Sequence, residues 1–188
     1  MLAALANIKS FKNITESNHD AELTRLIPVV QAFMETYCRR AFPLDTVTEY
    51  HTTAPGQMKI VLRRAPISSI TTIHDDPERV YGPATLLAST EYVRSNDQAG
   101  IVTFTRPVSS DAVHNLKVVY VGGYAETSPE WALLQQAAIE LIWLARDKGD
   151  QALLGLSSKS VADASMVLRN DWPAGVEAIL DLYRFQDR

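Results

Sequence analysis

Hydrophobic positions along the chain change their spacing twice, and these changes divide it into three zones. In residues 1–42 the apolar side chains recur every three or four residues, which is the spacing of amphipathic helices. A short helix is predicted at the start of this zone. A longer helix is predicted to begin at Ser17 to Asp20, because these two residues have the spacing of a capping box.

The middle zone, residues 46–121, consists of short runs of β-branched and aromatic residues separated by turn signals. The first two runs, 47–53 and 58–62, flank Pro55-Gly56 and predict a β-hairpin. Further strands are predicted at 66–74, 91–94, 100–105 and 116–121. The regular punctuation favours an antiparallel sheet or a small barrel-like module over a parallel, doubly wound sheet.

Residues 122–188 return to helical spacing. Ser128 followed by Pro129 predicts a helix start, because a cap residue and a proline at the first helical position both suit the first turn. The segment that follows is apolar almost all round, as expected of a helix buried on several sides. Trp172-Pro173 then opens a last amphipathic helix.

These patterns predict an α+β fold, in which a small helical bundle carries an antiparallel β-module inserted between its second and third helices. Residues 1–188 are expected to form a single domain, with the helical part at 1–45 and 122–188 and the inserted β-module at 46–121. The length of 188 residues and the hydrophobic content of 46% suffice for a core without metals or disulfides.

Composition argues against several classes of protein. The net charge is −4, whereas a protein that grips nucleic acid by its phosphates needs a basic face. The one cysteine, Cys38, cannot make an internal disulfide or a cysteine zinc site and is expected in the core. The chain shows no secretory signal and no apolar stretch near the roughly 20 residues that cross a bilayer. We therefore expect no membrane partner and a cytoplasm-like or particle environment.

Motifs for catalysis are nearly absent. The chain contains no nucleophile elbow, no phosphate-binding glycine loop and no histidine pair at the helical spacing of metal ligands. His74, Asp75 and Asp76 form the one acid-rich histidine cluster. This cluster is interpreted as a polar strand end before an Asp-Pro turn, or alternatively as the site of a small metal-dependent hydrolase. We expect no enzyme, no catalytic residue, no metal and no cofactor.

The last helix is the candidate partner-binding element. It carries an apolar stripe, and further apolar side chains lie off that stripe. Such a terminal helix either packs on its own bundle or docks on a partner as a helix in a groove, and the sequence leaves both open. The candidate partner-binding residues are Val176, Ile179, Leu180, Leu182, Tyr183 and Phe185.

An ordered series of segments resembles the head–tail connector proteins of tailed bacteriophages, which are also called adaptor or head-completion proteins. The segments are Asp20–Leu23, Leu26–Ile27 and Tyr37–Phe42, then Arg64–Ile67 with Ile70 and Ile73, Tyr92 with Gly100–Val102, Val118–Tyr124 followed by Pro129, and Ser158–Ser165. Together they span nearly the whole chain. The chain departs from the family pattern at Pro28, Ala162 and Ala164.

The resemblance implies a structural protein that forms a ring of identical copies, typically dodecameric, under the portal protein at the capsid vertex. Such a ring extends the DNA channel and joins the head to the neck and tail, where a stopper or tail-completion protein follows. DNA would pass without sequence-specific binding. The implied location is the neck of a virion, of a prophage particle or of a gene-transfer particle, after assembly in the bacterial cytoplasm. The alternative is another neck or tail-completion component.

Overall fold

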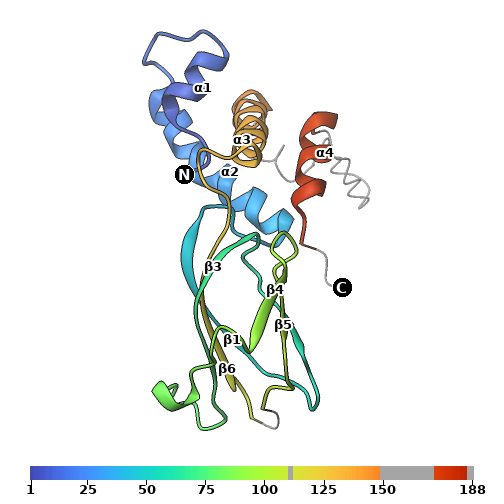
Figure 1. Ribbon diagram of the computed structural model, residues 1–188. Helices are drawn as coiled ribbons and strands as arrows, with labels where there is room; N and C mark the ends of the chain where they lie inside the picture. The colour runs from blue at the N-terminus through green and yellow to red at the C-terminus, as the bar shows by residue number, and fades with distance from the viewer. Residues whose placement is uncertain (110–111, 149–171, 186–188) are drawn as a thin grey trace, which may run out of the picture. The chain divides into compact units, whose positions relative to one another are not determined.

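The computed structural model describes residues 1–109, 112–148 and 172–185, and it contains two compact units, which are described separately (Figure 1). The helical unit comprises Met1–Arg40 and Glu126–Arg188, and the β-module comprises Ala41–Ala125. The predicted α+β class is confirmed, because helices and two small antiparallel sheets are both present. No helix in the described ranges is long and apolar enough to cross a membrane.

The helical unit is built from amphipathic helices that share one core. Its helices are α1 (Leu5–Phe11), α2 (Asp20–Cys38), α3 (Pro129–Lys148) and α4 (Ala174–Tyr183). The apolar stripe of α2 is buried from Leu23 to Cys38. Helix α3 is buried on several sides as predicted, and the indole nitrogen of its Trp143 donates to the carbonyl of Ile8 on α1 at 3.3 Å.

The two predicted helix starts have different outcomes. At α3 the prediction is confirmed, because the Ser128 hydroxyl accepts a hydrogen bond from the Trp131 amide at 3.1 Å. At α2 the capping box is wrong, because the N-cap residue is His19 and it makes no side-chain cap. The carboxylate of Asp20 instead pairs with the ammonium of Lys9 at 2.7 Å, so this acid ties α1 to α2.

The β-module consists of two three-stranded antiparallel sheets, ordered β1-β6-β3 and β2-β5-β4. The strands are β1 (Asp45–His51), β2 (Lys59–Val61), β3 (Ile67–Asp75), β4 (Tyr92–Asn96), β5 (Ile101–Phe104) and β6 (Leu116–Gly122), with a 3-10 turn η1 at Pro83–Thr85. All six predicted strands are therefore present, with shifted ends.

The predicted hairpin across Pro55-Gly56 is wrong, because its two strands belong to different sheets. All seven residues of β1 pair with the seven residues of β6, from Asp45 opposite Gly122 to His51 opposite Leu116. Strand β2 has three residues and pairs with β5. The longer partner offers β1 more than twice as many backbone pairs, so the turn passes the chain from one sheet to the other.

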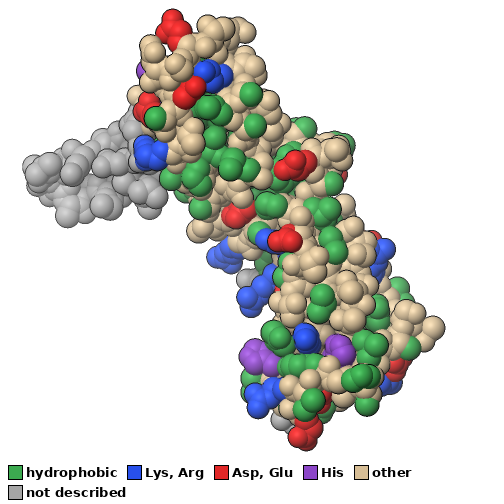
Figure 2. Space-filling view, turned by 90° about the vertical axis from the view of Figure 1, so that its left-hand side faces the viewer, with side chains coloured by type: hydrophobic (Ala, Val, Ile, Leu, Met, Phe, Trp, Pro, Cys, Tyr) green, Lys and Arg blue, Asp and Glu red, His purple; other side chains and the backbone are tan. Residues whose placement is uncertain are grey.

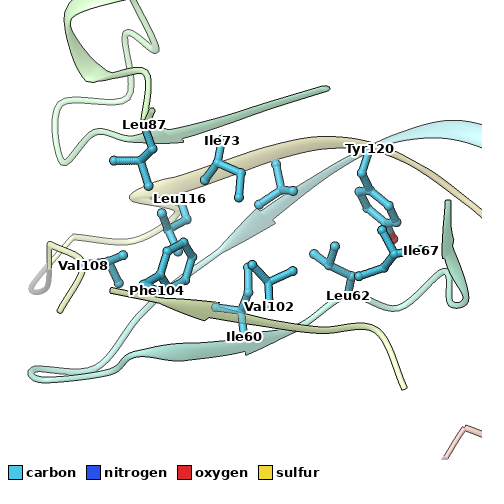
Figure 3. Close-up of a cluster of buried hydrophobic side chains, with 11 residues drawn as sticks. Ile60, Leu62, Ile67, Ile73, Leu87, Val102, Phe104, Val108, Leu116 and Tyr120 are labelled. Atoms are coloured by element: carbon cyan, nitrogen blue, oxygen red, sulfur yellow. The ribbon is translucent and has the colours of Figure 1, made fainter. Parts of the chain in front are cut away.

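The core of the β-module lies between the inner faces of its two sheets (Figure 3). Strand β6 alternates strictly, with Leu116, Val118 and Tyr120 buried and the residues between them half-buried. In Figure 3 the side chains of Ile73 and Tyr120 face those of Val102 and Ile60 from the opposite sheet. The period of two in the sequence therefore reports burial on one face of this sheet.

A polar network joins the buried Tyr120 of this core to the half-buried Glu49. The Tyr120 hydroxyl donates to the Glu49 carboxylate and accepts from the Arg64 amide at 2.9 Å. The same carboxylate accepts from the Arg63 amide at 3.1 Å and lies 3.2 Å from the imidazole of His51. Burial alone would raise the pKa of Glu49, but the contacts with His51, Tyr120 and Arg63 outweigh it and hold that pKa below its usual value.

The Gly122-Gly123 pair ends β6 where two backbones approach closely. A Cβ at Gly122 would lie 2.0 Å from the Arg64 carbonyl oxygen, and Gly123 has a left-handed φ of 109°. Both positions therefore require glycine. The next amide, of Tyr124, donates to the Phe42 carbonyl at 2.8 Å, so the strands through which the chain enters and leaves the β-module are tied together.

Candidate partner-binding surfaces

Helix α4 is fixed against α2 at its start by aromatic packing. Pro173 precedes its first turn, and the amide of Val176 donates to the Pro173 carbonyl at 2.8 Å. Trp172 is buried, and its ring meets those of Phe33 and Tyr37 edge-on, with centroids 5.2 Å and 5.0 Å apart. Edge-to-face pairs of this kind add about 0.5–1.5 kcal/mol each beyond burial.

The end of α4 is held by hydrogen bonds to the last turn of α2. The Tyr37 hydroxyl donates to Asp181 at 2.9 Å, and the Phe185 amide donates to the Cys38 carbonyl at 2.8 Å. The Cys38 thiol lies 3.4 Å from the Leu180 carbonyl. Burial raises the pKa of this thiol to about 12, so it is a packed, protonated side chain and not a nucleophile.

The structure separates the six candidate residues of the last helix into three groups. Val176, Leu180 and Tyr183 are buried within the helical unit, whereas Ile179 and Phe185 are half-buried. Leu182 is 76% exposed. The three buried residues pack within their own helical bundle, which was one of the two alternatives. Partner binding stays a prediction, and it rests on the exposed Leu182 together with the half-buried Ile179 and Phe185.

The acid-rich cluster at the end of β3 folds a loop. The Asp75 carboxylate accepts from the Ser109 amide at 2.9 Å, and the Asp76 carboxylate accepts from the amides of Tyr81 at 2.6 Å and Glu78 at 2.9 Å. Burial opposes ionisation of Asp76, but these amides outweigh it and lower its pKa. Within the described residues, no three histidine, cysteine or acidic side chains are grouped to hold a metal.

A second surface, which the sequence did not predict, lies at the end of β1 and on the adjoining loops of the β-module. Tyr50, Tyr81 and His114 place their rings together there, with the Tyr50 centroid 5.6 Å from that of Tyr81 and 6.0 Å from that of His114. The one local signal is that Val80-Tyr81 and Val113-His114 put apolar and aromatic residues side by side in otherwise polar loops. Tyr81 and His114 belong to no strand, so hydrophobic periodicity cannot detect them.

Comparison with solved structures shows chains that share this fold. The chain is similar to one in the neck of an empty gene transfer agent (GTA) particle computed with C6 symmetry, with a TM-score of 0.59 and 16% identity over 90% of this chain and 80% of that chain. It is similar to one in the neck of a native GTA particle computed with C12 symmetry, with a TM-score of 0.59 and 17% identity over 89% and 84%. A chain in the virion of the native particle gives a TM-score of 0.57 and 17% identity over 90% and 79%.

The family follows from the sequence itself. Residues 1–185 match the head completion protein (HCP) family, and the chain belongs to that family. It is a structural head completion protein of the bacteriophage type, and not an enzyme. The predicted resemblance to head-completion proteins is thereby confirmed. A search of curated proteins finds no match.

Proposed function

We propose that this protein is a head–tail connector, or adaptor, that forms a ring under the portal protein at the capsid vertex. The ring extends the DNA channel and joins the head to the neck and tail. The observation that carries this proposal is the family match over residues 1–185, supported by a fold shared with chains from GTA necks computed with sixfold and twelvefold symmetry. Twelve copies per ring is the stoichiometry we propose.

A ring requires two different faces on every subunit, because each face meets the other kind on a neighbour. The exposed side of α4 suits one such contact, with the portal or with a neighbouring copy. Leu182 lies on it beside the small exposed residues Gly175 and Ala178, which would let a partner backbone approach closely. Burying one leucine contributes about 1.5–3 kcal/mol. Since α4 is already fixed on α2, little further ordering would oppose binding.

The charge balance fits a channel that lets DNA move. The net charge of −4 gives the chain no overall attraction for phosphates, so duplex DNA would pass without sequence-specific binding. A stopper or tail-completion protein would follow on the side of the ring away from the head. We place the protein in the virion neck, after assembly in the bacterial cytoplasm.

Leu182→Glu tests the proposed contact. We expect this variant to fold normally and to lose at least tenfold in affinity for the purified portal, because it places a charge in an apolar interface. Phe11→Glu is the matched control, since Phe11 is also exposed, at 43%, but lies on α1. Light scattering of portal mixtures and thermal melts of each variant make the comparison. Full portal binding by Leu182→Glu would show that α4 does not contact the portal.

A further inference from the structure

The loops at one end of the β-module form a shallow pocket. Strands β1 and β3 end here and β6 begins here, so this tip is opposite the end at which the chain enters and leaves the module. The pocket has a volume of about 450 Å³ and is lined by Tyr50, Glu78, Arg79, Tyr81 and His114. Three aromatic rings and two opposite charges therefore meet at one place on the surface.

Hydrogen bonds hold the pocket in shape. The buried Asp76 carboxylate accepts from the Val80 amide at 3.0 Å as well as from those of Glu78 and Tyr81. The Tyr81 hydroxyl donates to the His114 carbonyl at 2.6 Å, which joins the two loops that form the pocket walls. A pocket that is already ordered loses little conformational entropy when it binds a ligand.

Backbone conformation also marks this pocket. Arg79, Tyr81 and His114 have φ values of 62°, 52° and 60°, in the left-handed region that residues other than glycine rarely adopt. Such conformations cost energy and persist where surrounding contacts enforce them, which is common at binding sites. Here the enforcing contacts are the Asp76 and Tyr81 hydrogen bonds.

The rim of the pocket is apolar and exposed. Val80 and Val113, which adjoin lining residues in the sequence, are 77% and 60% exposed, and Tyr50 is 47% exposed. At the lower end of Figure 2, hydrophobic side chains gather with basic and histidine side chains on this part of the surface. Aromatic side chains and arginine, surrounded by apolar contacts, are characteristic of the centres of protein–protein interfaces.

Two basic side chains at the tip offer ion-pair partners to an acidic ligand. Arg79 lines the pocket, and the ammonium of Lys117 lies 5.3 Å from the Tyr81 ring centroid. The Asp75 and Asp76 carboxylates keep their negative charge, but Asp76 is buried and both accept backbone amides, so Glu78 is the acidic side chain that lines the pocket beside Arg79. Two cations are too few to grip duplex DNA, and exposed valines have no counterpart on a phosphate backbone. A protein is therefore the better fit.

We infer that the tip binds an acidic segment of a neighbouring protein in the particle. An apolar side chain of that segment enters between Tyr50, Tyr81 and His114, and an adjacent carboxylate pairs with Arg79 and Lys117. This inference rests on the proposed function in placing the chain within a particle. It uses a different surface from α4, and it gives each connector subunit a second attachment.

Photo-crosslinking from the tip tests this inference. A benzophenone amino acid replaces Val80 in the full chain, particles are assembled and irradiated, and cross-linked peptides are sequenced by mass spectrometry. We expect cross-links to one protein segment that contains carboxylates beside an apolar residue. The matched control places the same probe at Val93, which is 57% exposed on β4, and we expect no cross-link to that segment.

Reversing the charge of Arg79 then tests whether the cross-link depends on a specific ion pair or only on the two proteins lying close together. Arg79→Glu is expected to lower the cross-link yield at least fivefold, and changing the partner carboxylate to lysine is expected to restore it. Lys117→Glu serves the same purpose if circular dichroism shows Arg79→Glu unfolded. Cross-links to DNA or to a basic segment, no cross-link, or a yield insensitive to both reversals would overturn the inference while leaving the ring intact. Particles that lack the wild-type protein altogether would overturn the proposed function.

Discussion

The helical unit and the β-module present their exposed apolar side chains in opposite ways. In the helical unit, α4 buries Val176, Leu180 and Tyr183 and leaves Leu182 exposed on a regular helix. In the β-module, Val80 and Val113 are exposed on loops whose backbone is fixed by buried polar groups. A regular apolar stripe therefore marks packing inside this protein, whereas the side chains available to partners lie outside the stripe.

The contrast within α4 gives the largest expected effect. Leu180→Ala removes a fully buried side chain and should lower the free energy of unfolding by about 2–5 kcal/mol. Leu182→Ala, two residues away, removes an exposed side chain and should change it by less than about 0.5 kcal/mol. Urea denaturation of the two variants measures the difference. Equal losses would show that Leu182 is packed and unavailable to partners.

The next effect concerns the polar network in the β-module. Tyr120→Phe leaves the half-buried Glu49 carboxylate and the Arg64 amide without their shared hydroxyl. We expect a loss of about 1–3 kcal/mol in unfolding free energy. Tyr50→Phe is the matched control, because the Tyr50 ring is 47% exposed, and its effect should stay below about 0.5 kcal/mol. Similar values for both would show that the network does not stabilise the module.

The same network predicts a dependence on pH. Because the pKa of Glu49 is lower in the folded chain than in the unfolded chain, its ionised form stabilises the fold above the unfolded value of about 4.3. This stabilisation is lost as the pH falls through the lower, folded value. The melting temperature of Glu49→Gln should therefore lie below that of the wild type at pH 6, and the difference between the two melting temperatures should be smaller at pH 3. Asp76 also has a lowered pKa, but it is present in both proteins, so its contribution does not affect the difference between them. A difference in melting temperature that stays constant with pH would show that the charge of Glu49 does not stabilise the fold.

The smallest expected effect is at the tip. Val80→Ser removes an exposed apolar side chain that the fold does not use, so unfolding free energy should change by less than about 0.5 kcal/mol. Thermal melts measure this directly. A loss as large as that of Tyr120→Phe would mean that Val80 supports the β-module itself and is not kept for a partner.

Periodicity in the sequence predicted the elements but not all of their partners. The alternation in β6 and the Ser128-Pro129 start were sufficient, because local burial and capping determine them. The partner of β1 was not predictable, since the Pro55-Gly56 turn is compatible with a hairpin or with a change of sheet. The choice depends on β6, more than 60 residues away in the chain.

The candidate site was predicted in part. The stripe of α4 was evident, but which of its residues face solvent depends on α2 and α3. The pocket at the tip brings Tyr50, Tyr81 and His114 together from three separate segments. The left-handed conformations of Tyr81 and His114 arise from loop contacts that no local pattern specifies.

The most direct test of the central claim is the solution mass of the purified protein, measured by light scattering alone and after mixing with its portal protein. A ring-sized species, or a monomer that joins the portal in about twelve copies, is the result we predict from the family and the symmetry of the related necks. A monomer or dimer that ignores the portal would contradict the connector proposal.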